Sequence, residues 1–194
     1  MLNLILFGPP GAGKGTQSQN IILKYELAHL STGDIFRANI KSETQLGVLA
    51  KSYIDKGQLV PDDVTIEMLQ SEVEKNPGAK GFIFDGFPRT AAQAQALDTL
   101  LEARNQKINI LVSLEVEEEE LKKRLLERGK TSGRADDVDP SVIQKRIEVY
   151  KAETTPVKEY YSKQGKTVEV NGIGDVQEIF KVIASKIDGK LESY

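Results

Sequence analysis

The most chemically distinctive segment of the chain is the glycine-rich stretch GPPGAGKGT at 8–16, which directly follows an apolar run at 2–7. Glycine, four residues, glycine and lysine is the spacing of the P-loop, in which backbone N–H groups converge on phosphate oxygens and Lys14 adds a positive charge. The position after the lysine holds Gly15, and the hydroxyl follows at Thr16, which leaves open whether this loop ligates Mg²⁺ directly. A purely structural glycine-rich turn is the alternative interpretation.

Two arginines in the second half of the chain share one face of a predicted helix. Arg124 and Arg128 are four residues apart, and the same stripe carries Leu121 and Leu125. A face that is both apolar and arginine-bearing indicates the wall of a cleft. The alternative is that both arginines only complement the negative end of the helix dipole.

A carboxylate and a further arginine follow the apolar run at 81–84. Asp85 comes where a parallel strand would open onto a ligand crevice, although a turn or capping aspartate is the alternative. Arg89 follows Pro88, which stiffens its loop, and taken alone it also fits a solvated surface arginine. His29 has no acidic or nucleophilic neighbour in sequence that marks it as catalytic, so we expect it to be structural.

Short apolar runs that alternate with helix-length segments predict an α/β fold with a parallel sheet covered by helices on both faces. Strands are predicted at 2–7, 81–84, 108–114 and 167–170, with a weaker one at 28–31. Helices are predicted at 13–25, 34–42, 45–56, 62–75, 90–104, 117–128, 140–162 and 175–188. The segments 31–60 and 129–139 interrupt the alternation, so we interpret them as insertions on a rigid core.

Composition narrows the class of protein further. The 194 residues, 39% hydrophobic and 28% charged, fit one globular domain, and the net charge of -3 argues against a broad nucleic-acid surface. The sequence contains no cysteine, which excludes disulfides, a thiol nucleophile and a thiolate zinc site. The apolar start is neither a signal peptide nor a membrane span, so we expect a cytoplasmic protein without a membrane partner.

Four motifs together resemble the nucleoside monophosphate kinases, specifically the adenylate kinase family, over essentially the whole chain. They are GPPGAGKGT at 8–16, LSTGD at 30–34, DGFPRT at 85–90 and RGKTSGRADD at 128–137. The resemblance implies a single three-layer P-loop domain with a five-stranded parallel sheet and two mobile insertions. Its core would be 1–30, 61–128 and 140–194, with an NMP-binding insertion at 31–60 and a short lid at 129–139.

The resemblance also implies roles for individual residues. ATP would be bound by Gly11, Ala12, Gly13, Lys14, Gly15, Thr16 and Arg128, with the backbone of Gly174 at the adenine. AMP would be bound by Thr32, Arg37, Gln58, Leu59, Val60, Gly86, Phe87, Pro88, Arg89, Gln93, Arg134 and Arg146. The catalytic cations would be Lys14, Arg89, Arg124, Arg128, Arg134 and Arg146, and Asp85 would hold Mg²⁺ through water.

These roles describe reversible conversion of MgATP and AMP into two ADP. Phosphoryl transfer needs positioning and positive charge, and the ionised AMP phosphate needs no general base. Closure of the lid, with backbone freedom at Gly129 and Gly133, would exclude water. Thr32 and Gln93 favour AMP over CMP or UMP, and a cysteine-free lid of about eleven residues is similar to the short-lid members, so no zinc is expected. A UMP/CMP kinase and a non-catalytic nucleotide sensor are the alternatives, and the family resemblance favours a monomer.

Overall fold

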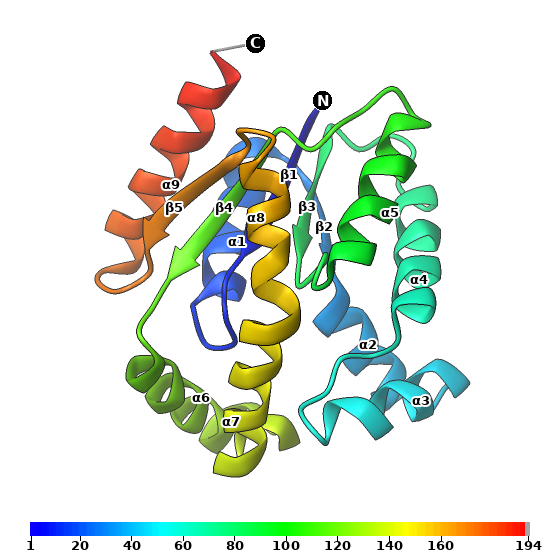
Figure 1. Ribbon diagram of the computed structural model, residues 1–194, viewed down its shortest axis with the longest axis vertical. Helices are drawn as coiled ribbons and strands as arrows, with labels where there is room; N and C mark the ends of the chain where they lie inside the picture. Colours follow the sequence, from blue (N-terminus) through cyan, green and yellow to red (C-terminus); the bar gives the residue numbers. More distant parts are fainter. Residues whose placement is uncertain (193–194) are drawn as a thin grey trace.

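The computed structural model describes residues 1–192 and contains a five-stranded, all-parallel sheet in the order β2-β3-β1-β4-β5 (Figure 1). The strands are β1 (Leu2–Phe7), β2 (Ala28–Ser31), β3 (Gly81–Asp85), β4 (Ile110–Glu115) and β5 (Thr167–Asn171). The helical elements are α1 (Lys14–Tyr25), α2 (Thr32–Lys41), α3 (Gln45–Ile54), α4 (Asp62–Glu74), α5 (Ala91–Glu102), α6 (Glu118–Ser132), η1 (Ala135–Asp137), α7 (Pro140–Val149), η2 (Tyr150–Thr154), α8 (Thr155–Ser162) and α9 (Val176–Leu191). The predicted fold class is confirmed.

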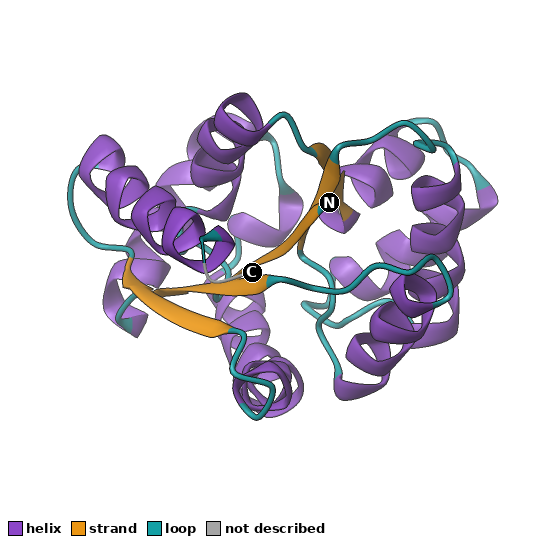
Figure 2. Cartoon of the chain, turned by 90° about the horizontal axis from the view of Figure 1, so that it is seen from above, coloured by secondary structure: helices purple, strands orange, loops and turns teal. Residues whose placement is uncertain are grey.

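The central strand shows why the apolar runs form strands buried on both faces. Leu4 and Leu6 of β1 belong to a core shared with α1 and α9, whereas Ile5 and Phe7 belong to a second core shared with α4, α5 and α8. Because successive side chains point to opposite faces, an uninterrupted apolar run fills both layers at once. Helices accordingly lie on both faces of the sheet (Figure 2).

The two segments predicted as insertions lie on opposite sides of the sheet's carboxyl edge (Figure 1). The first contains the hairpin of α2 and α3, which has its own small core around Phe36 and Ala50. The second follows α6 and contains η1. Their mobility and the boundaries 31–60 and 129–139 stay predictions.

Helix α6 extends four residues past the predicted end at 128. Gly129 is helical, and a Cβ built on it would lie 2.5 Å from the carbonyl oxygen of Asp137. Glycine at this position therefore allows close packing of η1 on α6 and does not free the backbone. Gly133, with φ of 66°, is the residue that ends the helix in a left-handed conformation.

The predicted helix at 140–162 is interrupted by the π-helical turn η2. Pro156 lies in the first turn of α8 and has no N–H to donate to the turn before it, so the regular α-helical hydrogen-bond ladder cannot pass through this point. Helix α2 begins earlier than predicted, at Thr32, because the Ser31 hydroxyl caps it by accepting from the N–H of Asp34 at 3.3 Å. Among residues 1–192, no helix is both long enough and apolar enough to cross a membrane.

Candidate active site

A cavity of about 540 Å³ opens at the carboxyl ends of β1 and β3, between the two insertions. With one exception, the predicted nucleotide-binding residues all line it. They are Gly11, Ala12, Gly13, Lys14, Gly15, Thr16, Thr32, Arg37, Gln58, Leu59, Val60, Asp85, Gly86, Phe87, Pro88, Arg89, Gln93, Arg124, Arg128, Arg134 and Arg146. The exception is Gly174, which lies in the β5–α9 loop with φ of 132° and is not part of this lining.

The glycine-rich loop joins β1 to α1 in a conformation that needs glycine. Gly11 has φ of 85°, and a Cβ there would lie 3.0 Å from Leu125 and 3.1 Å from the carbonyl oxygen of Leu121. The apolar stripe of α6 thus packs directly on the loop, as the shared arginine-bearing face predicts. Lys14 begins α1, and its ammonium donates to the carbonyl oxygens of Gly8 at 2.8 Å and Pro9 at 3.1 Å.

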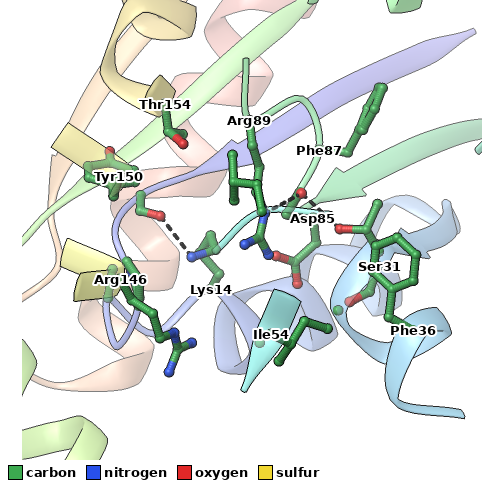
Figure 3. Close-up of a pocket in the computed structure, with 18 of the residues that line it drawn as sticks. Lys14, Ser31, Phe36, Ile54, Asp85, Phe87, Arg89, Arg146, Tyr150 and Thr154 are labelled. Carbon is green, nitrogen blue, oxygen red and sulfur yellow. Dashed lines mark hydrogen bonds between the residues drawn. The ribbon is translucent and has the colours of Figure 1, made fainter. Parts of the chain in front are cut away.

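The charge of Lys14 is held in an unfavourable environment. Its pKa is lowered to about 8, mainly by burial and also by the nearby cations Arg89, Arg128 and Arg146, while Asp85 acts in the opposite direction. Figure 3 shows Lys14 and Arg146 on one side of the opening and Asp85 and Arg89 on the other. A polyanion placed here would relieve the repulsion among the cations.

We therefore expect the binding of MgATP to be linked to proton uptake by Lys14. At about pH 9, Lys14 of the free protein is mostly neutral, and bound phosphate would restore its charge. We therefore expect close to one proton to be taken up on binding at this pH. The affinity for MgATP should fall as the pH rises through about 8. Titration calorimetry in buffers of different ionisation enthalpy measures this uptake. Lys14→Arg keeps its charge throughout this range and is the matched control. Absence of uptake at about pH 9 in the unmodified protein would contradict the expectation.

Arg89 is positioned by a carbonyl oxygen that it shares with Thr32. The Arg89 Nε donates to the oxygen of Gly86 at 2.7 Å, and the Thr32 hydroxyl donates to the same oxygen at 2.8 Å. Burial, together with repulsion from Arg146, lowers the pKa of Arg89 to about 10. This arginine is therefore poised for a strongly negative partner.

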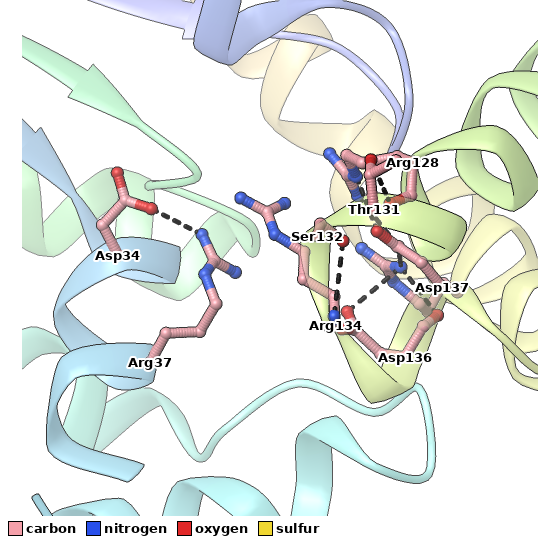
Figure 4. A network of polar contacts seen from close by, with 9 residues as sticks. Asp34, Arg37, Arg128, Thr131, Ser132, Arg134, Asp136 and Asp137 are labelled. Carbon is pink, nitrogen blue, oxygen red and sulfur yellow. Dashed lines mark hydrogen bonds and ion pairs between the residues drawn. The ribbon is translucent and has the colours of Figure 1, made fainter. Parts of the chain in front are cut away.

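Two acidic residues that were not among the predicted site residues hold Arg128 and Arg146 beside the cavity. Fully buried Asp137 accepts from the Arg128 Nε at 2.6 Å and from an Arg146 terminal nitrogen at 2.6 Å. Asp136 lies 3.1 Å from the same Arg146 nitrogen. Figure 4 shows Asp136 and Asp137 on the same side of the view as Arg128. Although burial alone would raise the pKa of Asp137, the hydrogen bonds from both arginines hold it below its usual value. The signal available in the sequence was their position two and three residues after Arg134.

The remaining predicted arginines are Arg37 in the first insertion, Arg134 in the second and Arg124 on α6. Arg37 of α2 pairs with Asp34 at 2.7 Å, on the side opposite Arg134 (Figure 4). Burial lowers the pKa of Arg134, and the charge of Arg37 contributes to the same shift. Arg124 donates to Glu120 at 2.8 Å and to the carbonyl oxygen of Gly172 at 3.1 Å, which links α6 to the loop after β5.

Asp85 lies at the end of β3 on the cavity floor. It is 8% exposed, and one of its carboxylate oxygens lies 3.5 Å from the Nε2 of His29 on neighbouring β2. Within the described part of the chain, no cluster of three or more His, Cys, Asp or Glu side chains could hold a metal. A single carboxylate beside a phosphate-binding loop fits Mg²⁺, which keeps several waters and is often bound through one carboxylate and substrate phosphates.

Gln93 is buried at the edge of the cavity, and its side-chain amide is already hydrogen-bonded on both atoms. Its Oε1 accepts from the backbone N–H of Arg89 at 2.8 Å, and its Nε2 donates to Asp62 at 2.7 Å. The other oxygen of Asp62 accepts from the hydroxyl of Thr90 at 2.9 Å. Asp62 cannot be recognised from the sequence, because nothing near it marks a partner 31 positions away.

Comparisons with known proteins agree with this geometry. The family model described as adenylate kinase matches residues 6–166. A protein of Flavobacterium psychrophilum named adenylate kinase is 57% identical over 188 residues, which are 97% of this chain and 99% of that protein. The adenylate kinases of Bacteroides fragilis and Flavobacterium johnsoniae are each 50% identical over 97% of this chain and 99% of their own length. The chain therefore belongs to the adenylate kinase family.

Proposed function

We propose that the cavity residues divide between two nucleotides in the reaction ATP + AMP = 2 ADP, which is the reaction of this family. The observation that carries the division is the convergence of the glycine-rich loop, Lys14 and the arginines of both insertions on one cavity at the carboxyl edge of the sheet. A cavity with this many cations suits two polyanionic ligands better than one.

On the ATP side, the backbone of 11–16 and the ammonium of Lys14 bind phosphate oxygens. The positive end of α1 supports this, as its first N–H groups have no partners within the helix. Arg128 and Arg124 reach the same region from α6. The proposed contact of the ATP adenine with Gly174 has less support, because that loop lies outside the cavity lining.

On the AMP side, Arg37 and Arg89 bind the acceptor phosphate, and Thr32 and Gln93 face the nucleoside. The backbone at 58–60 and the loop 86–88 form the remaining wall. The acceptor oxygen is already ionised at neutral pH, so the protein's task is to orient it and to neutralise the charge that spreads over the transferred group.

Arg134 and Arg146 add positive charge to the cavity wall on the side of the lid. When a phosphate enters, Arg146 can exchange its contacts with Asp136 and Asp137 for contacts with phosphate, and Arg134 gains an anionic partner, so ligand binding would favour a closed lid. Closure would exclude water, the competing acceptor. Mg²⁺, held by Asp85 through water, would supply further neutralisation of phosphate charge.

The test is the rate of phosphorylation of AMP, CMP, UMP and GMP at fixed MgATP. We expect AMP to be strongly preferred, with ADP as the product of both nucleotides. A preference for CMP or UMP would favour the UMP/CMP kinase alternative, and no ADP from folded protein would favour a nucleotide sensor.

The state and location of the protein are also proposals. We infer a monomer, because the cavity is completed by residues of one chain. We infer a cytoplasmic protein that acts on ATP and AMP or ADP without membrane or nucleic-acid partners, in agreement with its near-neutral charge. Gel filtration with light scattering tests the first of these inferences.

A further inference from the structure

We propose that Asp62 is a positioning residue that fixes the orientation of the Gln93 amide and so makes the monophosphate site reject guanine. This inference rests on the proposed role of Gln93 at the base of AMP. Asp62 is the first residue of α4, and its carboxylate bridges to the start of α5, where Thr90 and Gln93 lie.

The orientation of the amide follows from the chemistry of its two protein partners. An ionised carboxylate only accepts hydrogen bonds, and a backbone N–H only donates them. The Nε2 of Gln93 must therefore face Asp62, and its Oε1 must face the N–H of Arg89. Rotating the amide by half a turn would place oxygen against carboxylate and N–H against N–H, which loses both bonds.

Asp62 also acts on the backbone at the start of α5, in addition to the side chain of Gln93. The Thr90 hydroxyl donates its single proton to Asp62 at 2.9 Å, so it can only accept from the N–H of Gln93, which it does at 3.2 Å. This bond caps α5, and Thr90 is its N-cap residue. The Asp62 carboxylate thus helps to fix both the start of α5 and the direction in which the Gln93 amide points.

The fixed amide leaves one lone pair on Oε1 and one hydrogen on Nε2 for a ligand. An acceptor beside a donor pairs with a base edge that offers a donor beside an acceptor, as the N6 amino group and N1 of adenine do. Guanine is the same size but offers the reverse, a keto oxygen at position 6 beside N1–H. It would face like against like, and with Asp62 in place the amide cannot turn to accommodate it.

The test compares kcat/KM for AMP and GMP in the full-length enzyme. We expect Asp62→Ala to lower the AMP-over-GMP ratio by about tenfold or more, because a hydrogen bond to a charged group that holds the amide is lost. The KM for AMP should rise while the KM for ATP stays close to that of the unmodified enzyme. A ratio measured on one preparation does not depend on the fraction that is folded, so partial unfolding cannot imitate the result.

Two variants separate amide orientation from charge at the helix start. Asp62→Asn keeps an oxygen that can accept from Gln93, and we expect it to retain most of the selectivity. Asp63→Ala removes the neighbouring carboxylate, which is exposed and bonds only the N–H of Val64, and we expect no change in the ratio. An unchanged ratio in Asp62→Ala, or an equal loss in Asp63→Ala, would overturn the proposal.

Gln93→Ala distinguishes this inference from the proposed base site on which it rests. If Gln93→Ala keeps the AMP-over-GMP ratio of the unmodified enzyme, Gln93 does not read the base and the proposed site itself is wrong. If Gln93→Ala loses the ratio and Asp62→Ala keeps it, only the positioning role of Asp62 is wrong.

Discussion

Arg89→Ala is expected to lower kcat by roughly 10³-fold, the lower end of what a single transition-state arginine contributes in phosphoryl transfer. The guanidinium lies on the cavity side of the loop after β3, near Lys14 and Arg146, where we propose that the phosphoryl group is transferred. Its loss would also remove the proposed partner of the AMP phosphate, so the KM for AMP should rise as well. Steady-state kinetics with both substrates varied measures the two effects.

The same substitution should leave the fold almost unaffected. The folded protein holds the pKa of Arg89 below its ordinary value, which means that its environment disfavours the charged form, so removing the guanidinium also removes repulsion. The carbonyl oxygen of Gly86 keeps the bond from Thr32 and is not left unpaired. We expect a melting temperature that falls little or rises.

Arg104→Ala is the matched control, because Arg104 follows the far end of α5 and does not line the cavity. It should keep full activity. An Arg89→Ala enzyme that turns over at near-normal rate would show that the guanidinium has no part in transfer. A large loss of stability in the same variant would point instead to a structural role.

The largest effect on stability is expected for Asp137→Ala, with a loss of about 3 kcal/mol in the free energy of unfolding. Asp137 is fully buried and accepts three hydrogen bonds, two from Arg128 and one from Arg146. Its removal takes away the counterion of Arg128 and leaves Arg146 with Asp136 as its remaining carboxylate partner, which costs far more than the loss of a surface pair. Denaturant unfolding followed by circular dichroism measures the change.

The contribution of Asp137 should also depend on pH in a definite direction. Because its folded pKa lies below the unfolded value of 3.8, its stabilising effect is fully present above that value and is lost as the pH falls through the folded pKa. The variant should therefore lack part of the acid destabilisation of the unmodified protein. Glu127→Ala removes an exposed carboxylate paired with Lys130 on α6, and a loss there within about 0.5 kcal/mol is the expected contrast. Equal losses in both variants would contradict the assignment.

The sequence predicts the strands and the glycine-rich loop well because both depend on local chemistry. An unbroken apolar run such as 4–7 of β1 favours a strand buried on both faces, and the GPPGAGKGT segment needs its glycines where φ is positive. The end of α6 was harder to predict. Gly129 looks like a helix breaker in sequence, and only the approach of Asp137 explains why it is helical.

The partners of the site residues were beyond sequence reasoning because they are set by distance in space. Arg128 and Arg146 were predicted as site residues, but their counterion Asp137 is defined by the way η1 folds back on α6. Likewise, the family resemblance predicts Gln93 as a site residue. Its bond to Asp62 could not be predicted, because it joins the starts of two separate helices, α4 and α5. Gly174, placed at the ATP adenine by resemblance, does not line the cavity.

The charge of this protein is unevenly distributed. Its net charge is -3, yet Lys14 and six arginines line a single cavity. The rest of the surface is correspondingly acidic. Because cations outnumber carboxylates in the cavity lining while the whole chain is acidic, we expect anionic nucleotides to be attracted to the mouth of the cavity more than to the rest of the surface. Sulfate or inorganic phosphate in a buffer would occupy the same end, and apparent substrate affinities will depend on the choice of buffer anion as well as on ionic strength.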